Sequence, residues 1–219
     1  MHVHHLHDWD VSPKDAVAIQ KDFAERLITE PLDIASVQYV AGVDVSVKNN
    51  VSQAAVVILS FPALDVVEVQ TASMPTPFPY VPGLLTFREG PALEMAFQQV
   101  QQIPHALIFD GMGRIHPRRM GIAAHFGLWL DLPTIGCGKT HFIGEYAEPG
   151  IEKGAYSPLH YHGEQLGVVL RTRTNVKPVY ISPGHRCDID SAIALTLRCT
   201  PKYRLPEPVR RAHNAAGEM

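Results

Sequence analysis

Three features are scarce in this sequence, and each absence narrows the possible functions. The 219 residues carry a formal net charge of −3, so a nucleic-acid partner would have to meet a local basic patch. The three cysteines, Cys137, Cys187 and Cys199, lack CxxC spacing, which argues against a zinc site or a disulfide framework. No apolar run has the length of a signal peptide or a membrane span. We therefore expect a soluble, cytoplasmic protein with no membrane partner and no obligate protein partner.

The length and the apolar content predict one domain over residues 1–219. Hydrophobic residues make up 46% of the chain, and no repeat, low-complexity tract or linker divides it. Four histidines in the first seven residues could bind a metal ion. They precede the first helix signal, however, so we expect residues 1–11 to form a flexible end.

The order of elements predicts an α/β fold. Ser12 is a plausible N-cap for a first helix, and three β-rich runs with short links predict an antiparallel meander (37–47, 53–60 and 64–72). The segment MPTPFPYVPG holds four prolines in ten residues and predicts a stiff loop. Further strands are expected at 105–110, 133–138, 165–172 and 178–182, with helices around 93–100, 120–131, 188–199 and 206–215. This pattern favours a mixed sheet flanked by helices.

Two aspartates stand out by their positions. One would be costly to bury in an apolar strand, and the other lies where α/β sheets bind ligands. Asp44 lies inside the first strand between Val43 and Val45, and Asp110 ends the ALIF strand. Ligands of open α/β sheets bind beyond the carboxyl ends of strands, which is where Asp110 falls. Each aspartate could equally cap a turn, since Asp–Gly at a strand end is ordinary turn chemistry.

Glu89 is a third acid on a surface that should face the core. It lies four residues before Leu93 on the same helical face, although its spacing from Thr86 also fits a capping box. Carboxylates gathered at one end of the sheet repel one another unless divalent cations neutralise them. Oxygen ligands favour Mg²⁺, with Mn²⁺ as a substitute, and such a site suits phosphodiester hydrolysis.

Five motifs, in this order, carry a resemblance to a known family: YVAGVDVS, PFPYVPGLLTFRE, FDGMGRIHPRRMGIAAHFG, PTIGCGKT and SPGHRCDIDSA. Together they resemble endonuclease V, a nuclease of deaminated nucleic acids with a ribonuclease H-like fold. The resemblance implies cleavage of the second phosphodiester bond 3′ to deoxyinosine, leaving a 3′-hydroxyl and a 5′-phosphate. It implies metal ligation by Asp44, Glu89 and Asp110, and a further site position at His213, which could instead be an exposed histidine of a polar helix.

The resemblance also implies roles for the residues around these acids. Lys139 would lie near the scissile phosphate or, alternatively, be a solvated lysine; GCGKT is no P-loop, because Pro133 stands where that motif needs glycine. Gly111 and Gly113 would let the backbone approach a ligand closely. We expect His116 and one arginine, Arg118, to meet phosphate and Arg119 to be solvated.

Substrate recognition is assigned by resemblance to the proline-rich loop and to main chain around it. Tyr80 would act as a wedge that fills the gap left by a base turned out of the stack. The wedge and the base pocket would comprise Tyr80, Val81, Pro82, Gly83, Leu85, Gly111 and Ile122, while Met112 departs from many family members. Backbone amides and carbonyls can distinguish hypoxanthine from adenine.

The sequence analysis therefore predicts a metal-dependent endonuclease for DNA that contains deoxyinosine. An inosine-specific endoribonuclease is the enzyme alternative, because the same fold and carboxylates can cut either polymer. A non-catalytic lesion-binding protein is a further alternative, which the complete set of three acids with Lys139 disfavours.

Overall fold

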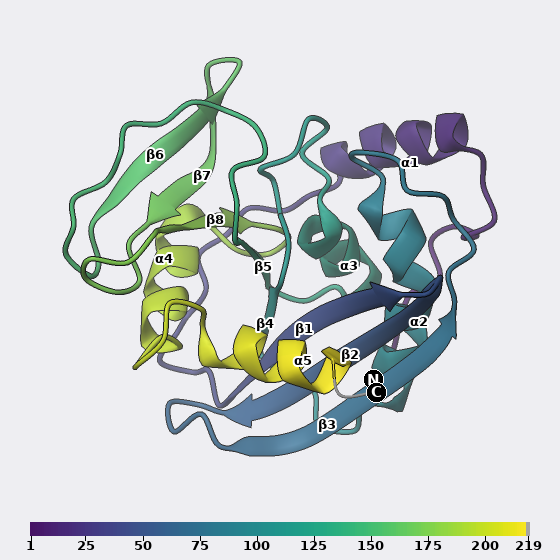
Figure 1. The fold of residues 1–219 in the computed structure, drawn as a ribbon, viewed down its shortest axis with the longest axis horizontal. Coiled ribbons are helices and arrows are strands. Elements are labelled where there is room, and N and C mark those ends of the chain that lie inside the picture. Colours follow the sequence, from purple (N-terminus) through teal and green to yellow (C-terminus); the bar gives the residue numbers. More distant parts are fainter. Residues whose placement is uncertain (218–219) are drawn as a thin grey trace.

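An eight-stranded mixed β-sheet organises the chain (Figure 1). The structure is a computed structural model that describes residues 1–217, so the last two residues of the predicted domain 1–219 lie outside the described part. The strands are β1 (Tyr39–Lys48), β2 (Val51–Ser60), β3 (Val66–Pro75), β4 (Ala106–Phe109), β5 (Thr134–Gly138), β6 (Tyr156–Tyr161), β7 (Glu164–Leu170) and β8 (Val179–Pro183). Their order in the sheet is β3-β2-β1-β4-β5-β8-β7-β6.

The predicted antiparallel meander is confirmed. β1 pairs with β2 through a two-residue hairpin at Asn49 and Asn50, whose φ angles of 53° and 58° suit the strand twist, and β2 pairs with β3. β4 joins β1 in parallel, and β5 joins β4 in parallel. β6 was not among the predicted strands. It contains Pro158, which is tolerated because β6 lies at the edge of the sheet.

Helices cover both faces of the sheet and enclose two apolar cores. Leu93 and Phe97 belong to the core beneath the first three helices, whereas Leu195 and Val209 belong to the core beneath the last two. The helices are α1 (Pro13–Glu25), α2 (Leu85–Gln99), α3 (Ile122–Leu130), α4 (Ile189–Arg198) and α5 (Glu207–Gly217). Within residues 1–217, every helix is too short or too polar to span a bilayer. Ser12 caps α1 as predicted, accepting a hydrogen bond from the Asp15 amide at 3.2 Å.

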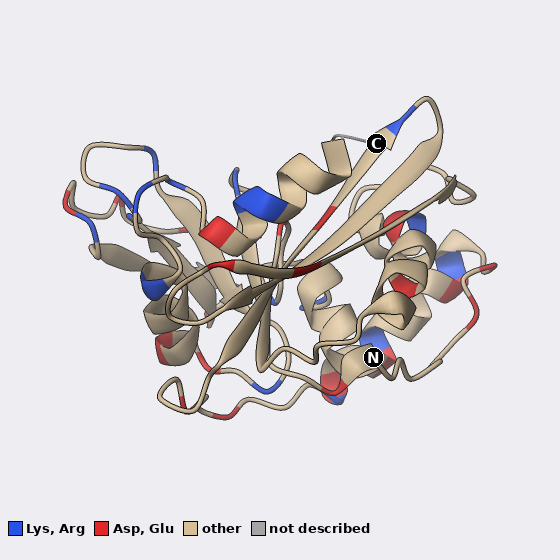
Figure 2. Cartoon of the chain, turned by 90° about the horizontal axis from the view of Figure 1, so that it is seen from below, with Lys and Arg blue, Asp and Glu red and all other residues tan. Residues whose placement is uncertain are grey.

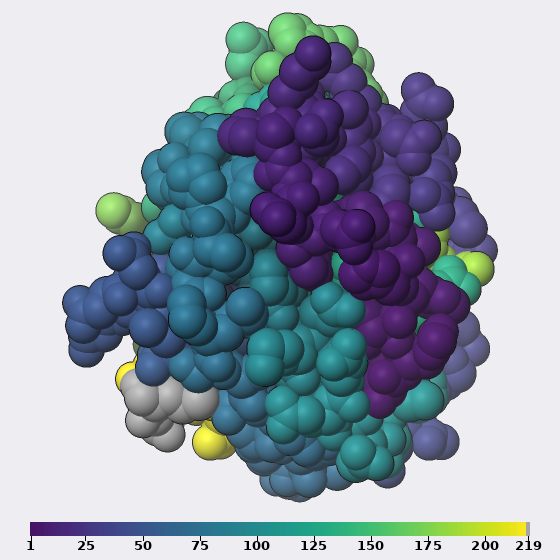
Figure 3. Space-filling view, turned by 90° about the vertical axis from the view of Figure 1, so that its right-hand side faces the viewer, coloured from purple at the N-terminus to yellow at the C-terminus, as the bar shows by residue number. Residues whose placement is uncertain are grey.

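The N-terminal segment differs from the expected flexible end. Figure 3 shows residues of this segment lying over the surface of the following elements. The Trp9 indole donates to Glu94 at 2.7 Å and covers Gly90 so closely that a Cβ there would meet its ring at 2.3 Å. His7 Nε2 lies 2.8 Å from Nε2 of the buried His125. The sequence did not predict this packing, because Trp9 contacts residues of α2 and α3 that lie far away in the chain; Glu94, for example, is 85 positions away.

Candidate active site

Strand pairing brings Asp44 and Asp110 side by side. In the parallel pair β1–β4, Val43 faces Phe109, and the Asp110 amide donates to the Val43 carbonyl at 2.8 Å. Asp44 is therefore adjacent to Asp110, one residue beyond the end of β4. Asp44 is buried, and its carboxylate also accepts a hydrogen bond from the Val45 amide at 2.9 Å. The predicted convergence of these two acids is confirmed.

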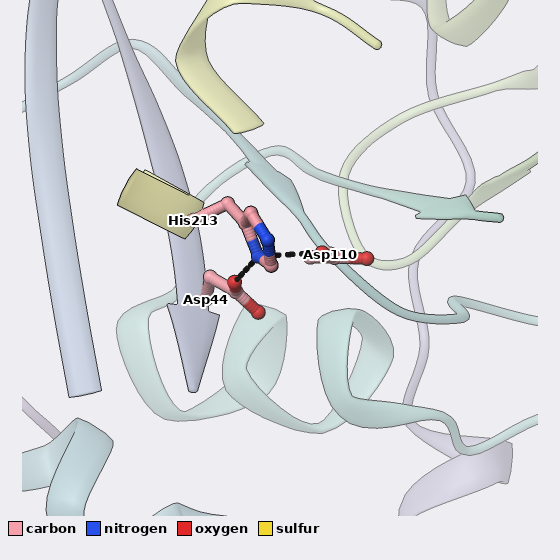
Figure 4. A group of neighbouring side chains, drawn as sticks. All are labelled: Asp44, Asp110 and His213. Carbon is pink, nitrogen blue, oxygen red and sulfur yellow. Dashed lines mark hydrogen bonds and ion pairs between the residues drawn. The ribbon is translucent and has the colours of Figure 1, made fainter. Parts of the chain in front are cut away.

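Helix α5 supplies the third side chain of the cluster. Gly42 permits the close approach of α5 to β1, since a Cβ there would overlap the Pro208 carbonyl oxygen at 1.9 Å. This contact brings His213 over the strand: Nδ1 lies 2.7 Å from Asp44 Oδ2 and 3.9 Å from Asp110 Oδ2 (Figure 4). The ligand atoms of Asp44, Asp110 and His213 all lie within 4.8 Å of one another, which is close enough to hold one metal ion.

Glu89 and Lys139 complete the charged group. The capping box does not form, because α2 begins after Leu84 with no side-chain cap, and Glu89 instead lies near the two aspartates. Burial, reinforced by the charges of Asp44 and Asp110, raises the pKa of Glu89 to about 8. Lys139 follows β5, and its ammonium forms an ion pair with the Asp110 carboxylate. The Lys139 ammonium therefore has a partner within the protein, and its place near a scissile phosphate stays a prediction.

The donor set fits a divalent cation. Burial and the neighbouring Asp110 raise the pKa of Asp44, so the folded chain alone holds these carboxylates at an electrostatic cost. Oxygen ligands from two aspartates with one imidazole nitrogen match a hard cation such as Mg²⁺ or Mn²⁺. Glu89 adds a further carboxylate whose ionisation a bound cation would favour.

A cavity of about 320 Å³ lies at the proline-rich loop, and its lining includes Gly111 and Thr140, the residues that follow Asp110 and Lys139. Its lining includes eight of the predicted recognition residues: Tyr80, Val81, Pro82, Gly83, Leu85, Gly111, His116 and Ile122. Tyr80 is 73% exposed, so its ring does not pack in the core. Gly111 has a φ of 154°, and a Cβ there would meet Ile122 at 2.7 Å, inside the cavity wall.

The contacts of His116 and Arg118 give these residues a role that the sequence did not predict, while their contact with phosphate stays a prediction. Both side chains are turned inward and hold the proline-rich loop through one atom, the Gly83 carbonyl oxygen. His116 Nε2 lies 3.0 Å from this oxygen, Arg118 donates to it at 2.8 Å, and Gln20 donates to it at 3.0 Å. Burial, with the Arg118 charge, lowers the pKa of His116 to about 4, so the imidazole is neutral at pH 7 and supplies no positive charge.

The other basic and glycine positions of this loop also have internal partners. Arg119 pairs with Glu164 rather than being free in solvent, and Arg114 donates to the carbonyls of Gly184 and Ile28 at 3.3 Å. A Cβ on Gly113 would meet the Pro183 carbonyl oxygen at 2.5 Å. Gly113 therefore permits the close packing of its loop on β8.

Several residues of the site were absent from the sequence prediction. Thr140, His141 and Phe142 line the cavity, and Arg204 donates to the Lys139 carbonyl at 2.7 Å. Gln20 could have been found from the sequence, because it is the polar residue on the helical face that it shares with Ala16 and Phe23, and a buried amide needs hydrogen-bond partners. The others left none, because their roles arise from contacts between distant segments.

Comparisons with known proteins agree with this arrangement. The Endonuclease V family profile matches residues 21–214. An "Endonuclease V" of Nostoc punctiforme is 50% identical over 212 residues, covering 96% of each chain. The crystal structure of an endonuclease V from Streptomyces avermitilis is 41% identical with a TM-score of 0.92, over 100% of this chain and 97% of that one. A Ciona intestinalis endonuclease V, in complex with a 23mer DNA containing an inosine followed by a ribo-adenosine, is 26% identical with a TM-score of 0.84, over 95% and 98%.

The mixed sheet with acids at its centre is a ribonuclease H-like fold that carries a nuclease site. The chain belongs to the endonuclease V family.

Proposed function

We propose that this protein is a metal-dependent endonuclease of DNA repair that recognises deaminated bases, chiefly deoxyinosine. It hydrolyses the second phosphodiester bond 3′ to the lesion and leaves a 3′-hydroxyl and a 5′-phosphate. One observation carries the proposal. The cavity lined by the exposed Tyr80 is also lined by Gly111, which directly follows Asp110 of the acidic cluster. The chain would act as one domain over residues 1–219 in the cytoplasm, on DNA.

Asp44, Asp110, Glu89 and His213 are the residues that would hold Mg²⁺, or Mn²⁺ in its place. When bound, the cation supplies Lewis-acid activation of water and stabilises the leaving oxygen of a phosphodiester. The protein's own contribution is the rigid placement of the ligands on β1, on the end of β4 and on α5. Lys139, paired with Asp110, stands where its ammonium can meet the charge of a scissile phosphate.

The deaminated base would be recognised by the cavity and by the proline-rich loop. A cavity of about 320 Å³ lies within the range of small-ligand sites and is lined mainly by apolar side chains and backbone. A base turned out of the duplex would enter it and be read by main-chain groups around Gly83 and Gly111. Tyr80, held by a loop with Pro79 and Pro82, would then fill the vacated space in the stack.

The DNA preference has one specific competitor, an inosine-specific endoribonuclease. The Ciona relative is complexed with DNA in which the inosine is followed by a ribo-adenosine, so a ribonucleotide stands at that position in its complex. The same carboxylates can hydrolyse either polymer. A lesion-binding protein without chemistry is disfavoured because Asp44, Glu89, Asp110 and Lys139 are all present and gathered.

The test is a nicking assay on matched DNA and RNA strands, each with and without one inosine, in Mg²⁺, Mn²⁺ or chelator. We expect a nick at the second phosphodiester 3′ to deoxyinosine, only with metal, and none with Asp110→Asn. Melting temperature provides a second readout: Mg²⁺ should raise it for the wild type and much less for Asp110→Asn, because binding to the folded state stabilises that state. Faster cutting of inosine RNA than of inosine DNA would overturn the DNA assignment.

A further inference from the structure

A strongly basic segment lies outside the site described above. Residues 198–211, here called the basic segment, contain five Lys or Arg residues and one acid in a chain whose net charge is −3. Four of the cations, Arg198, Lys202, Arg210 and Arg211, line one hollow of about 420 Å³ together with Tyr203. In Figure 2, basic positions appear on the first turns of the helix that ends near the C-terminus, which is α5. Positive charge is therefore concentrated around this hollow.

The charges of the basic segment face solvent in ordered positions. Arg198 and Lys202 are exposed, and neither forms an ion pair within residues 1–217. The Arg198 guanidinium lies 4.9 Å from the centre of the Phe61 ring, and that of Arg210 lies 4.7 Å from the centre of the Tyr203 ring. Glu207 binds both Arg210 and Arg211 at 2.7 Å and so fixes their direction while neutralising only one charge.

The basic segment adjoins the catalytic cluster at two points. Arg210 precedes His213 by one turn of α5, a rise of about 4.5 Å along the helix axis. Arg204 donates to the Lys139 carbonyl at 2.7 Å and, through the same nitrogen, to the Pro178 carbonyl at 2.8 Å. Arg198 and Lys202 differ from Arg118 and Arg119, which bind the Gly83 carbonyl and the Glu164 carboxylate.

We propose that the basic segment is the surface that binds the phosphodiester backbone of duplex DNA flanking the cleavage site. The proposal rests on the proposed function and adds to it the place where the flanking strand lies. A polyanion fits because the surface offers several cations and an exposed aromatic ring, and because α5 carries both Arg210 of this surface and His213 of the acidic cluster. Arg198 and Lys202 each contact a phosphate in this complex.

The experiment measures DNA affinity against salt concentration for the double variant Arg198→Gln/Lys202→Gln. The control is Lys21→Gln/Arg26→Gln at the C-terminal end of α1, which also removes an exposed lysine and an arginine that lies 4.8 Å from a phenylalanine ring centre. Unlike Arg198, Arg26 also lies 3.7 Å from a carboxylate, that of Asp22. The probes are an inosine duplex with long flanks and one truncated on the 3′ side. Each phosphate contact contributes about 0.9 to the slope of log affinity against log salt.

We expect the basic-segment variant to lose about 2 in this slope and roughly 10- to 100-fold in affinity for the long duplex at 0.1 M salt. Truncation should shrink the loss, and the single-turnover rate on saturated DNA should stay at the wild-type value. An unchanged slope, or equal losses in both double variants, would overturn the proposal. If the basic-segment variant loses slope and affinity as expected but the wild type nicks no inosine substrate, the proposed function fails while the binding surface stands.

Discussion

The acidic cluster and the three side chains that hold the proline-rich loop, Gln20, His116 and Arg118, are polar regions that differ in how far their charges and hydrogen bonds are satisfied. These three side chains are called the support below. In the cluster, Asp44 and Glu89 have raised pKa values because they are buried beside another carboxylate. In the support, the Gly83 carbonyl oxygen is contacted by three side chains at 2.8–3.0 Å. In the cluster, the contacts with His213 and Lys139 do not cancel the rise in the pKa of Asp44, whereas the hydrogen bonds at Gly83 are satisfied within the folded chain.

This difference indicates which region awaits a ligand. Gathered carboxylates are costly unless a cation or a positively charged group offsets them, so the cluster is suited to binding and chemistry. A satisfied network of buried groups stabilises one conformation, so the support is suited to holding Tyr80 and Gly83 in place. A basic motif in the sequence therefore does not identify a phosphate site by itself. Arg118, for example, donates hydrogen bonds to Gln20 and to the Gly83 carbonyl.

The largest expected effect comes from removing one carboxylate of the acidic cluster. Asp44→Asn should abolish Mg²⁺-dependent nicking, a loss on the order of 1000-fold or more, because the neutral amide cannot replace an anionic ligand worth several kcal/mol. The free energy of unfolding should change by less than about 1 kcal/mol, since the variant also removes carboxylate repulsion. Single-turnover nicking and urea unfolding measure the two quantities; a nicking rate near that of the wild type would remove Asp44 from the mechanism.

The next effect tests what the support holds in place. Tyr80→Ala should weaken binding of an inosine duplex by about 5- to 150-fold, because stacking worth roughly 1–3 kcal/mol is lost. The rate on saturated substrate should fall less, since the acids and Lys139 are unaffected, and the defect should shrink when the inosine is single-stranded. The 73% exposure of Tyr80 predicts an unchanged melting temperature. Normal affinity would exclude the wedge role.

The last expected effect appears only in acid: it is a pH dependence of stability caused by His116. His116 has a folded pKa of about 4 against about 6.5 in an unfolded chain, so it is neutral in both states above pH 6.5 and its contribution is then fully present. As the pH falls from 6.5 to 4, the unfolded chain takes up the proton first and stability is lost, by up to about 3 kcal/mol.

The comparison that isolates this loss is unfolding of the wild type and of His116→Gln between pH 8 and pH 4. His116→Gln should be less stable at pH 8, because the imidazole contacts with Gly83 and with the Arg118 amide are altered. The stability gap should close as the pH falls. A constant gap across this range would show that His116 does not titrate as its burial implies.

Much of the fold follows from local pattern. The alternation and the turn residues around Asn49 and Asn50 predicted the meander, and Ser12 predicted the start of α1. The strand pattern allowed the expectation that Asp44 and Asp110 could converge, and the parallel pairing of β1 with β4 places them side by side. Residue types and chain order were sufficient for these features, since each depends on short-range geometry or on simple strand adjacency.

Other features depended on contacts that no local pattern encodes. The inward turn of His116 and Arg118 arose from Gln20 and Gly83, which lie about 100 and 35 positions away along the chain. The packing of Trp9 on Gly90 ordered a segment whose composition predicted a flexible end. The sequence by itself determined which side chains could act and where the strands would place the acids. Tertiary structure decided which charges remained available, because hydrogen bonds between distant segments satisfy some of them and leave others to solvent.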